Sequence, residues 1–342
     1  MVKTSGSARL RRSDCSRPGV HRVRRGRGFS YVDEQGERVG ERDLLERIRA
    51  LAIPPAWSDV WICADPLGHL QATGIDAAGR KQYLYHAAWQ KRREREKFRR
   101  MVAFARALGP LRRHIGVDLR GPELTRERVL ACAARLLDIG LFRIGGEEYA
   151  DDDGGLGLAT LQREHVQLRN GGALFDYRAK GGVRRIHVVD DARCVEVLRA
   201  LVSCKRRQKQ LLAYRDGRRW VSVRSHEINE YLKHHMGEEF SAKDFRTWNA
   251  TVLAAVALAA SERDAASHTA RQRVVKRALA DVAALLGNTP AVARSSYVDP
   301  RVIDRYLSGH TISGALAGVR PRDPGGRARG RIERAVIELL EE

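Results

Sequence analysis

The chain has 342 residues, a length that suits two domains with a core each, since one domain typically takes about 100 to 200 residues. Its 63 Lys and Arg outnumber its 42 Asp and Glu, and the resulting formal charge of +21 makes a polyanion, above all nucleic acid, the expected partner. The sequence contains no run of about 18 apolar residues and no signal-peptide pattern, which argues against a membrane protein. We therefore expect a cytoplasmic protein.

Metal and cofactor chemistry finds no support in the sequence. His226-Glu227 lacks the second His that a zinc-protease helix needs, and Gly155 and Gly157 are not followed by the Lys-Ser/Thr of a phosphate loop. The cysteines are odd in number, include no Cys-x-x-Cys pair, and are expected to be free thiols that lie mostly in the core. They are Cys15, Cys63, Cys132, Cys194 and Cys204. We expect no metal and no cofactor.

The N-terminal part predicts a basic arm and a β-rich lobe. Residues 1–28 are rich in Lys and Arg and poor in apolar side chains, so we expect a flexible basic arm. A short helix over 42–52 should end at Pro54-Pro55. Strands over 60–63, 69–75 and 82–86, separated by turns that contain Gly, predict a three-stranded meander. These elements place a β-rich lobe at 29–93.

The rest of the chain, 94–342, predicts a larger and mainly helical lobe. A charged helical pattern from 87 to 108 leads into it, and a helix over 125–139 should end at Gly140. A second meander (165–168, 173–180, 183–189) and a hairpin (211–215, 218–223) follow. Further helices are predicted over 225–236 with Ser225 as cap, 241–261 with a Ser241/Asp244 capping box, 265–286 ended by Gly287, and 332–340. The fold class is α+β.

Four separate segments each place a polar side chain where an ordinary core or loop would not need it. In Leu141–Tyr149, Arg143 lies between apolar residues just beyond a helix end; a structural salt bridge to Glu147 or Glu148 is the simpler interpretation. In Phe175–Val183, Lys180 lies at a hairpin tip with glycines behind it. A tip lysine is usually only solvated, but a mobile hairpin could lower its ammonium into a groove to protonate a leaving alkoxide.

The other two segments lie on predicted helices. In Lys243–Trp248, Phe245 and Trp248 share one helix face while Arg246 points elsewhere, so Arg246 could also be an ordinary surface arginine. In Leu286–Tyr297, one helix ends at Gly287, Thr289-Pro290 begins a short second helix, and Tyr297 falls near its end. A tyrosine in such a place is more often a packed anchor.

Taken together and in this order, the four segments resemble the catalytic constellation of type IB DNA topoisomerases of the poxvirus and bacterial kind. The similar features are Arg143, Lys180, the Lys-x-x-Arg-x-Trp motif at 243–248, the Gly-Asn-Thr-Pro motif at 287–290, and Tyr297. Segments 54–62 and 68–86 look like that family's DNA-contacting β lobe. The resemblance extends over roughly residues 30 to 310 and implies the catalytic lobe shared by tyrosine recombinases and type IB topoisomerases, with a short three-stranded sheet.

The resemblance implies a reaction as well as a fold. Tyr297 would cleave one strand of duplex DNA to leave a 3′-phosphotyrosine, and religation after strand rotation would relax supercoils without ATP or metal. Arg143 and Arg246 would neutralise the phosphoryl oxygens, Asn288 would add a hydrogen bond, and Lys180 would protonate the leaving 5′-oxygen. Poxvirus and eukaryotic members carry His where this chain has Asn288, which removes any cationic contribution from that position.

The resemblance also implies how DNA is held. A monomer would close as a clamp around double-stranded DNA, in a bacterium on the nucleoid. The residues expected to contact DNA are Arg80, Gln82, Tyr83, Tyr85 and Lys243. For Gln82, Tyr83 and Tyr85 the alternative is a strand that merely packs its own lobe.

A second departure from the family pattern, Ala179 where Gly is usual before the lysine, should stiffen the hairpin slightly.

Two competing functions remain open from the sequence. A tyrosine recombinase uses the same set of catalytic residue types, Arg, Lys, Arg and Tyr. Two features count against it: Lys243 stands where recombinases usually have a His, and the predicted N-terminal lobe is β rather than helical. A non-catalytic DNA-binding protein would need only the positive charge.

Overall fold

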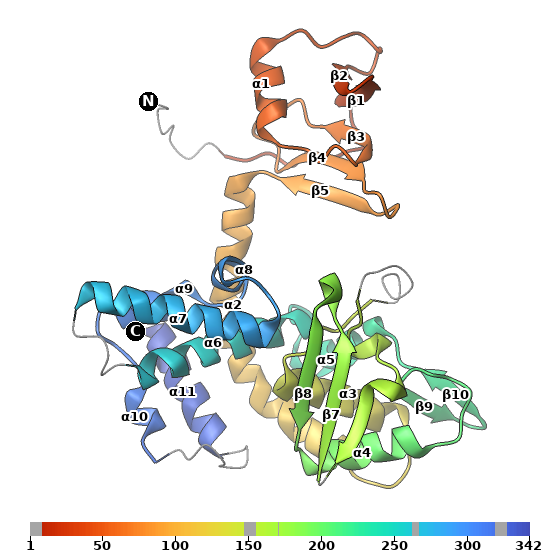
Figure 1. Cartoon of the computed structure of the whole chain (residues 1–342), viewed down its shortest axis with the longest axis vertical. Coiled ribbons are helices and arrows are strands. Elements are labelled where there is room, and N and C mark those ends of the chain that lie inside the picture. Colours follow the sequence, from red (N-terminus) through yellow and green to blue (C-terminus); the bar gives the residue numbers. More distant parts are fainter. Residues whose placement is uncertain (1–8, 147–154, 170, 262–266, 319–326) are drawn as a thin grey trace. The chain divides into compact units, whose positions relative to one another are not determined.

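The computed structural model describes residues 9–146, 155–169, 171–261, 267–318 and 327–342 (Figure 1). The chain divides into two compact units, Met1–Lys97 and Phe98–Glu342. Helix α2 (Ala87–Asp118) begins in the first unit and continues into the second. Within the described ranges, no helix is both long and apolar enough to span a membrane.

The first unit is built on a five-stranded antiparallel sheet with strand order β2-β1-β3-β4-β5. Helix α1 (Arg42–Ala50) contributes Ile48 to a core that also contains Val20, Val60, Ile62 and Ala72. The predicted helix and three-stranded meander are confirmed, and two strands precede them. The strands are β1 (Val20–Arg25), β2 (Gly28–Val32), β3 (Ser58–Ile62), β4 (Leu70–Ile75) and β5 (Lys81–Tyr85).

The prediction of a flexible basic arm over 1–28 is wrong for most of its described part: Ser13 and Arg17 form hydrogen bonds to the sheet of the first unit, and Val20–Arg25 form strand β1. This strand pairs with β2 on one side and with β3 on the other. The guanidinium of Arg22 lies 4.2 Å from the ring centroid of Phe29 and donates to the carbonyl oxygen of Pro54 at 3.0 Å. Phe29 lies on the neighbouring strand, whereas Pro54 is 32 residues away, a partner that the composition of the segment alone could not reveal.

The second unit is mainly helical, as predicted, and has one large core. Helix α3 (Arg126–Gly140) is capped by Thr125, whose side chain accepts from Arg128 N. Helix α2 is longer than the predicted 87–108, because it continues through Pro110 to Asp118. Its apolar face is buried on both sides of that proline, and Phe104 packs edge-to-face against Phe245 with ring centroids 5.0 Å apart. Packing therefore outweighs the local cost of a proline within a helix.

The second meander is confirmed as a three-stranded sheet with order β6-β7-β8. Its inward side chains include Phe175, which packs against Phe142. The predicted hairpin is also present. The strands are β6 (Val166–Arg169), β7 (Gly172–Arg178), β8 (Arg184–Val189), β9 (Ala213–Asp216) and β10 (Arg219–Ser222). Helix α4 (Ala192–Ser203), which the sequence analysis did not identify, begins at an Asp191 cap and packs on this sheet (Figure 1).

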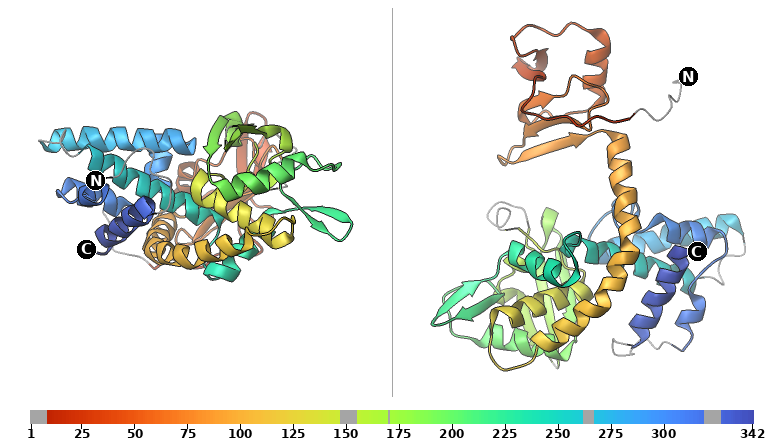
Figure 2. Two further views of the ribbon diagram at one scale, coloured as in Figure 1. Left: turned by 90° about the horizontal axis from the view of Figure 1, so that it is seen from below. Right: turned by 180° about the vertical axis from the view of Figure 1, so that it is seen from behind.

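The predicted C-terminal helices are present, and α6 and α7 pack side by side (Figure 2). The Ser241/Asp244 capping box forms as predicted, whereas Ser225 is the first helical residue and Arg224 takes the cap position. The predicted start of the next helix, residue 265, lies outside the described residues. The helices are α5 (Ser225–Met236), α6 (Ala242–Ala260), α7 (His268–Leu286), α8 (Pro290–Ser296), α9 (Pro300–Leu307), α10 (Ser313–Leu316) and α11 (Arg327–Glu341).

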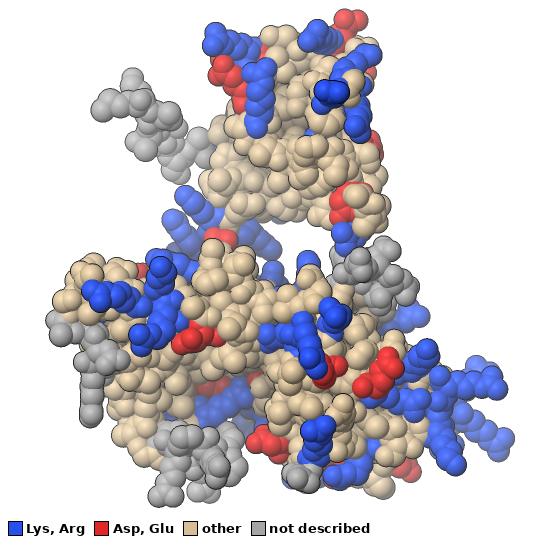
Figure 3. All heavy atoms as spheres, viewed as in Figure 1, with Lys and Arg blue, Asp and Glu red and all other residues tan. Residues whose placement is uncertain are grey.

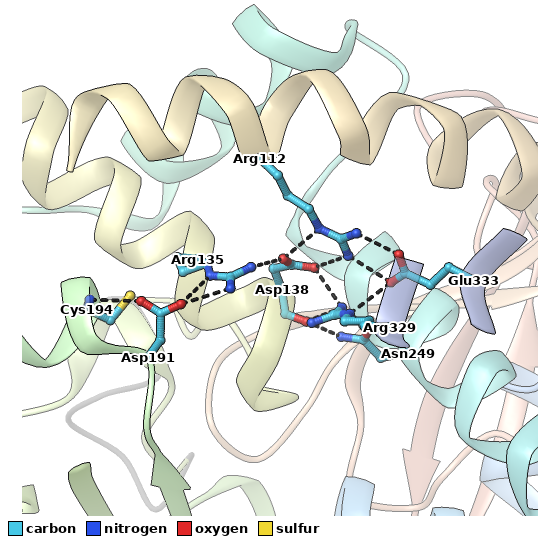
Figure 4. A network of polar contacts seen from close by, with 8 residues as sticks. All are labelled: Arg112, Arg135, Asp138, Asp191, Cys194, Asn249, Arg329 and Glu333. Atoms are coloured by element: carbon cyan, nitrogen blue, oxygen red, sulfur yellow. Dashed lines mark hydrogen bonds and ion pairs between the residues drawn. The ribbon is translucent and has the colours of Figure 1, made fainter. Parts of the chain in front are cut away.

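A buried ionic network joins α2, α3 and α11 (Figure 4). The carboxylate of Asp138 on α3 accepts from Arg112 on α2 at 2.8 Å, Arg135 at 2.8 Å and Arg329 on α11 at 2.8 Å. Glu333 on α11 accepts from Arg112 and Arg329. Since Asp138 precedes Arg143 by only five residues, the network fixes the end of the helix from which the Arg143 segment leaves.

Candidate active site

The junction of α7 and α8 carries Asn288 and Tyr297. Gly287 ends α7 with a left-handed φ of 63°, a conformation that glycine adopts without strain. Thr289 then caps α8 by accepting from Val292 N, and Pro290 occupies the first turn, where no backbone donor is needed. Tyr297 is the C-cap residue of this short helix.

The segment around Tyr297 is held by α6 and α9. Thr251 Oγ1 on α6 lies 3.3 Å from the carbonyl oxygen of Tyr297 and accepts from Asp299 N at 3.1 Å. The buried carboxylate of Asp299 pairs with Arg301 at 2.7 Å. Arg301 also donates to the carbonyl oxygens of Phe98 and Leu340, at 3.0 and 2.9 Å. The backbone that follows Tyr297 is therefore tied to residues at both the beginning and the end of the second unit's sequence.

Arg246 is buried on α6, with 4% of its surface exposed. It is not the ordinary surface arginine of the simpler interpretation. Its guanidinium donates to the carbonyl oxygens of Leu141 and Leu286, and its Cζ lies 5.2 Å from the ring centroid of Tyr297. Leu141, rather than the predicted Gly140, takes the left-handed conformation at the end of α3, with φ of 55°.

Arg143 reaches the same place from the segment after α3. Its Nη2 donates to Asn288 Oδ1 at 2.6 Å and to the carbonyl oxygen of Gly287 at 3.3 Å. The side-chain amide nitrogen of Asn288, Nδ2, is buried and has no hydrogen-bond partner among the described residues. The same holds for Arg246 Nε. Two buried donors are thus left for an acceptor. Glu147 and Glu148, the alternative partners expected for Arg143, lie outside the described residues.

The positive charges of the cluster favour the ionised, phenolate form of Tyr297. Burial, with a further contribution from Arg143, lowers the pKa of Arg246 to about 10. Burial alone would raise the pKa of the Tyr297 phenol, but attraction to Arg246, Arg143 and Lys243 outweighs it and leaves the pKa below its usual value. The phenol is therefore easier to deprotonate than a free tyrosine.

Lys180 lies at the tip of the β7–β8 hairpin and is exposed. The hairpin is closed by Ala179 N donating to Val183 O at 2.8 Å, and Gly181 and Gly182 both have positive φ. The ammonium of Lys180 makes no hydrogen bond or ion pair with any residue that the structure describes. The structure brings Arg143, Arg246, Asn288 and Tyr297 together, but it does not bring Lys180 into contact with them.

The residues expected to contact DNA in the first unit lie on or next to the edge strand β5. Tyr83 and Tyr85 are 47% and 39% exposed, and their rings stack with centroids 6.2 Å apart. Gln82 alternates with them along the strand and donates to Asp76 at 2.8 Å, and Arg80 pairs with the same carboxylate. In the second unit, Lys243 is exposed.

Two polar residues on β8 were missed by the sequence analysis. Arg185 donates to the carbonyl oxygen of Ala284 near the end of α7 and lies 3.3 Å from His187. The signal was the alternation of the strand, which places Arg185 and His187 on the same face as the buried Val189. A charged residue on the inward face of a strand needs a partner in the interior.

Basic side chains also gather outside this cluster. Figure 3 shows a dense group of Lys and Arg over the β9–β10 hairpin, where Arg215, Arg218 and Arg219 are exposed. This distribution agrees with the high net charge of the sequence, +21.

Comparison with known proteins assigns most of the chain to one family. Residues 86–308 match the family described as eukaryotic DNA topoisomerase I, catalytic core, and residues 28–76 match the bacterial DNA topoisomerase IB N-terminal domain. DNA topoisomerase 1B of Acanthamoeba polyphaga mimivirus is 29% identical over 294 residues, which cover 84% of this chain and 87% of the viral protein. DNA topoisomerase 1 of Schizosaccharomyces pombe is 30% identical over 136 residues, 39% of this chain and 16% of the yeast protein.

The first match spans more than half of the chain and includes all the residues of the cluster described above. The second covers most of the β sheet of the first unit. The chain therefore belongs to the type IB DNA topoisomerase family, and it is an enzyme of the isomerase class.

Proposed function

We propose that this enzyme relaxes supercoiled duplex DNA by transient cleavage of one strand through Tyr297, strand rotation and religation, without ATP or metal. It acts as a monomer that closes around the duplex, and in a bacterium its place of action is the nucleoid in the cytoplasm. The observation that carries the proposal is a pair of buried donors, Asn288 Nδ2 and Arg246 Nε, that have no partner among the described residues, with the guanidinium carbon of Arg246 5.2 Å from the ring centroid of Tyr297. Buried donors without a partner are rare and call for an acceptor, and the non-bridging oxygens of a phosphodiester supply it.

The cleavage step follows from the chemistry of these groups. The phenolic oxygen of Tyr297 forms a bond to phosphorus and loses its proton, while the bond from phosphorus to the 5′-oxygen breaks. Arg246 and Arg143 lower the free energy of both the phenolate and the phosphoryl charge that develops. The departing 5′-oxygen needs a proton, and Lys180, on a hairpin tip with two flexible glycines behind it, is the proposed donor.

Religation reverses the same step. The 3′-phosphotyrosine retains the free energy of the broken phosphodiester, so attack by the 5′-hydroxyl needs no ATP. Between the two steps the free end can rotate about the intact strand, and torsion in the DNA drives that rotation. Because rotation relieves torsion in either direction, supercoils of both signs are relaxed.

Contacts with the duplex are proposed for both units. The exposed and stacked Tyr83 and Tyr85 suit the edges of bases in a groove or the adjacent backbone, with Arg80 and Gln82 beside them on the same hairpin. Lys243 is exposed on α6 and close enough to Tyr297 to lower its pKa, which suits a phosphate next to the cleaved bond.

The test is relaxation of a supercoiled plasmid in EDTA and without ATP. Wild-type enzyme should relax it, and Tyr297→Phe should abolish both relaxation and the covalent protein–DNA adduct while DNA affinity changes little, because only the phenolic oxygen is lost. Tyr214→Phe is the matched control, since that phenol contacts Glu227 outside the cluster. An absolute requirement for metal or ATP, or an active Tyr297→Phe variant, would overturn the proposal; a need for paired DNA sites would indicate a recombinase instead.

A further inference from the structure

The last carbonyl groups of α7 are bound by three arginines from three different elements. An α-helix leaves its last four carbonyl oxygens without helical partners, and its C-terminus carries partial negative charge. Arg185 on β8 donates to Ala284 O at 2.9 Å and to Leu285 O. Arg246 donates to Leu286 O at 3.0 Å, and Arg143 to Gly287 O at 3.3 Å. The C-terminus of this helix thus accepts hydrogen bonds from three guanidinium groups.

The backbone of this turn is closely defined. Gly287 N donates to Ala284 O at 3.1 Å and Asn288 N donates to Ala283 O at 2.9 Å, which is the hydrogen-bond pattern of a Schellman C-cap. A Cβ at Gly287 would lie only 3.0 Å from Arg185 Nη1, so Arg185 approaches the turn more closely than most side chains at this position would allow. A shift of the turn would move the acceptors of Arg143 and Arg246 together with Asn288.

Arg185 links this turn to the rest of the site. Its Nη2 lies 3.3 Å from His187 Nε2. Burial, aided by the charges of Arg185 and Arg246, lowers the pKa of His187 to about 4, so the imidazole is neutral at pH 7 and can accept from Arg185. The imidazole packs against Phe142, the residue between Leu141, which Arg246 binds, and Arg143.

We propose that Arg185 is a positioning residue for the cleavage reaction: by bridging β8 to Ala284 and Leu285, it fixes the turn that holds Arg143, Arg246 and Asn288. Its own donors are directed at protein carbonyls rather than at DNA. The inference rests on the proposed function. It predicts that loss of Arg185 slows the chemical step more than it weakens DNA binding, because a small displacement of aligned catalytic groups has a large effect on rate.

The test compares single-turnover cleavage rates on a duplex that carries a cleavage site mapped with the wild-type enzyme. Arg185→Ala should cleave about 10- to 100-fold more slowly, with a DNA dissociation constant within about twofold of wild type. Arg185→Lys retains the charge but cannot bridge two carbonyl oxygens as a guanidinium does. Its cleavage rate should therefore lie between the rates of wild type and of Arg185→Ala. Arg184→Ala is the matched control, because Arg184 is the neighbouring residue on β8 and pairs with Asp176 at 2.6 Å.

Two outcomes would overturn the inference: a rate for Arg185→Ala equal to wild type, or a loss of rate that is fully explained by weaker DNA binding. Should Arg185→Ala fail to fold, Arg185→Lys carries the test, and a rate equal to wild type overturns the bridging role. If Tyr297→Phe still forms the adduct, the proposed function itself fails. If that variant is inactive while both Arg185 variants behave as wild type, only the inference about Arg185 fails.

A substrate with sulfur in place of the 5′-bridging oxygen separates two ways in which Arg185 could act. A thiol has a pKa of about 8.5, so a thiolate leaves without a proton from a general acid. If Arg185 positions the guanidiniums, Arg185→Ala stays slow on this substrate. Full recovery of the rate would show that Arg185 acts by placing Lys180, five residues earlier in the chain, and would contradict the assignment.

Discussion

Replacement of Asp138 by Asn tests how much the buried ionic network contributes to stability. The side chain keeps its shape but loses its charge, which leaves Arg112, Arg135 and Arg329 with only Asp191 and Glu333 as anionic partners. Burial raises the pKa of Asp138, but Arg329, Arg112 and Arg135 more than offset this and hold the pKa at about 2, against a usual value of 3.8. That difference corresponds to about 2.5 kcal/mol of stability at pH 7.

The sign of the pH dependence follows from the lowered pKa. The stabilisation is fully present above pH 3.8, the value in the unfolded chain, and is lost as the pH falls toward 2. Asp138→Asn should therefore lower the free energy of unfolding by about 2.5 kcal/mol at pH 7, and the gap to wild type should narrow in acid. Asp138→Ala, which also removes the hydrogen-bond acceptors, should cost about 3–5 kcal/mol.

Urea unfolding followed by far-ultraviolet circular dichroism, at pH 7 and at stepwise lower pH, measures both effects. Asp190→Asn is the control, because Asp190 is exposed and has no ion-pair partner among the described residues. Its unfolding free energy should stay within about 0.5 kcal/mol of wild type. The reasoning is refuted if Asp138→Asn is as stable as this control at pH 7, or if the gap persists unchanged in acid.

Three further predictions concern the reaction. Lys180→Ala should slow cleavage of ordinary DNA about 10²- to 10⁴-fold but cleave the 5′-sulfur substrate nearly as fast as wild type; equal defects on both substrates would exclude Lys180 as the acid. Asn288→Asp keeps the oxygen that accepts from Arg143 but loses the free donor, so single-turnover cleavage should fall about 10²- to 10³-fold, and an unchanged rate would contradict the role. Lys243→Ala should reduce the salt dependence of DNA binding by about 0.9 in log–log slope, and an unchanged slope would show that Lys243 neutralises no phosphate.

Local signals in the sequence were sufficient to predict the helix ends that carry the site. Gly287 followed by Thr289-Pro290 predicts the break between α7 and α8, and the Ser241/Asp244 box predicts the start of the helix that carries Arg246. These signals are reliable because they act within a single turn of backbone.

Features that depend on distant partners could not be predicted in the same way. Strand β1 was taken for part of a flexible arm because one of its sheet neighbours, β3, and the carbonyl partner of Arg22 at Pro54 are distant in sequence; its other neighbour, β2, follows directly and was overlooked. Helix α4 could have been predicted locally, because Asp191 caps it and its buried residues Cys194, Val197, Leu198 and Leu201 follow helical spacing; the sequence analysis overlooked this signal. The convergence of Arg143, Arg246 and Tyr297 was inferred from a family pattern, and no rule of local structure would have predicted it.

The attachment of Tyr297 through Thr251, Asp299 and Arg301 has a mechanical consequence. In the proposed covalent state, twisted DNA pulls on the phenol at the end of a helix only seven residues long. Helix α8 alone offers little resistance, but Arg301 connects the following segment to the carbonyl oxygens of Phe98 and Leu340, which lie near opposite ends of the second unit's sequence. Torque on the broken strand is thereby distributed over α2, α6 and α11, so the 3′ end stays in place for rejoining while the other end turns.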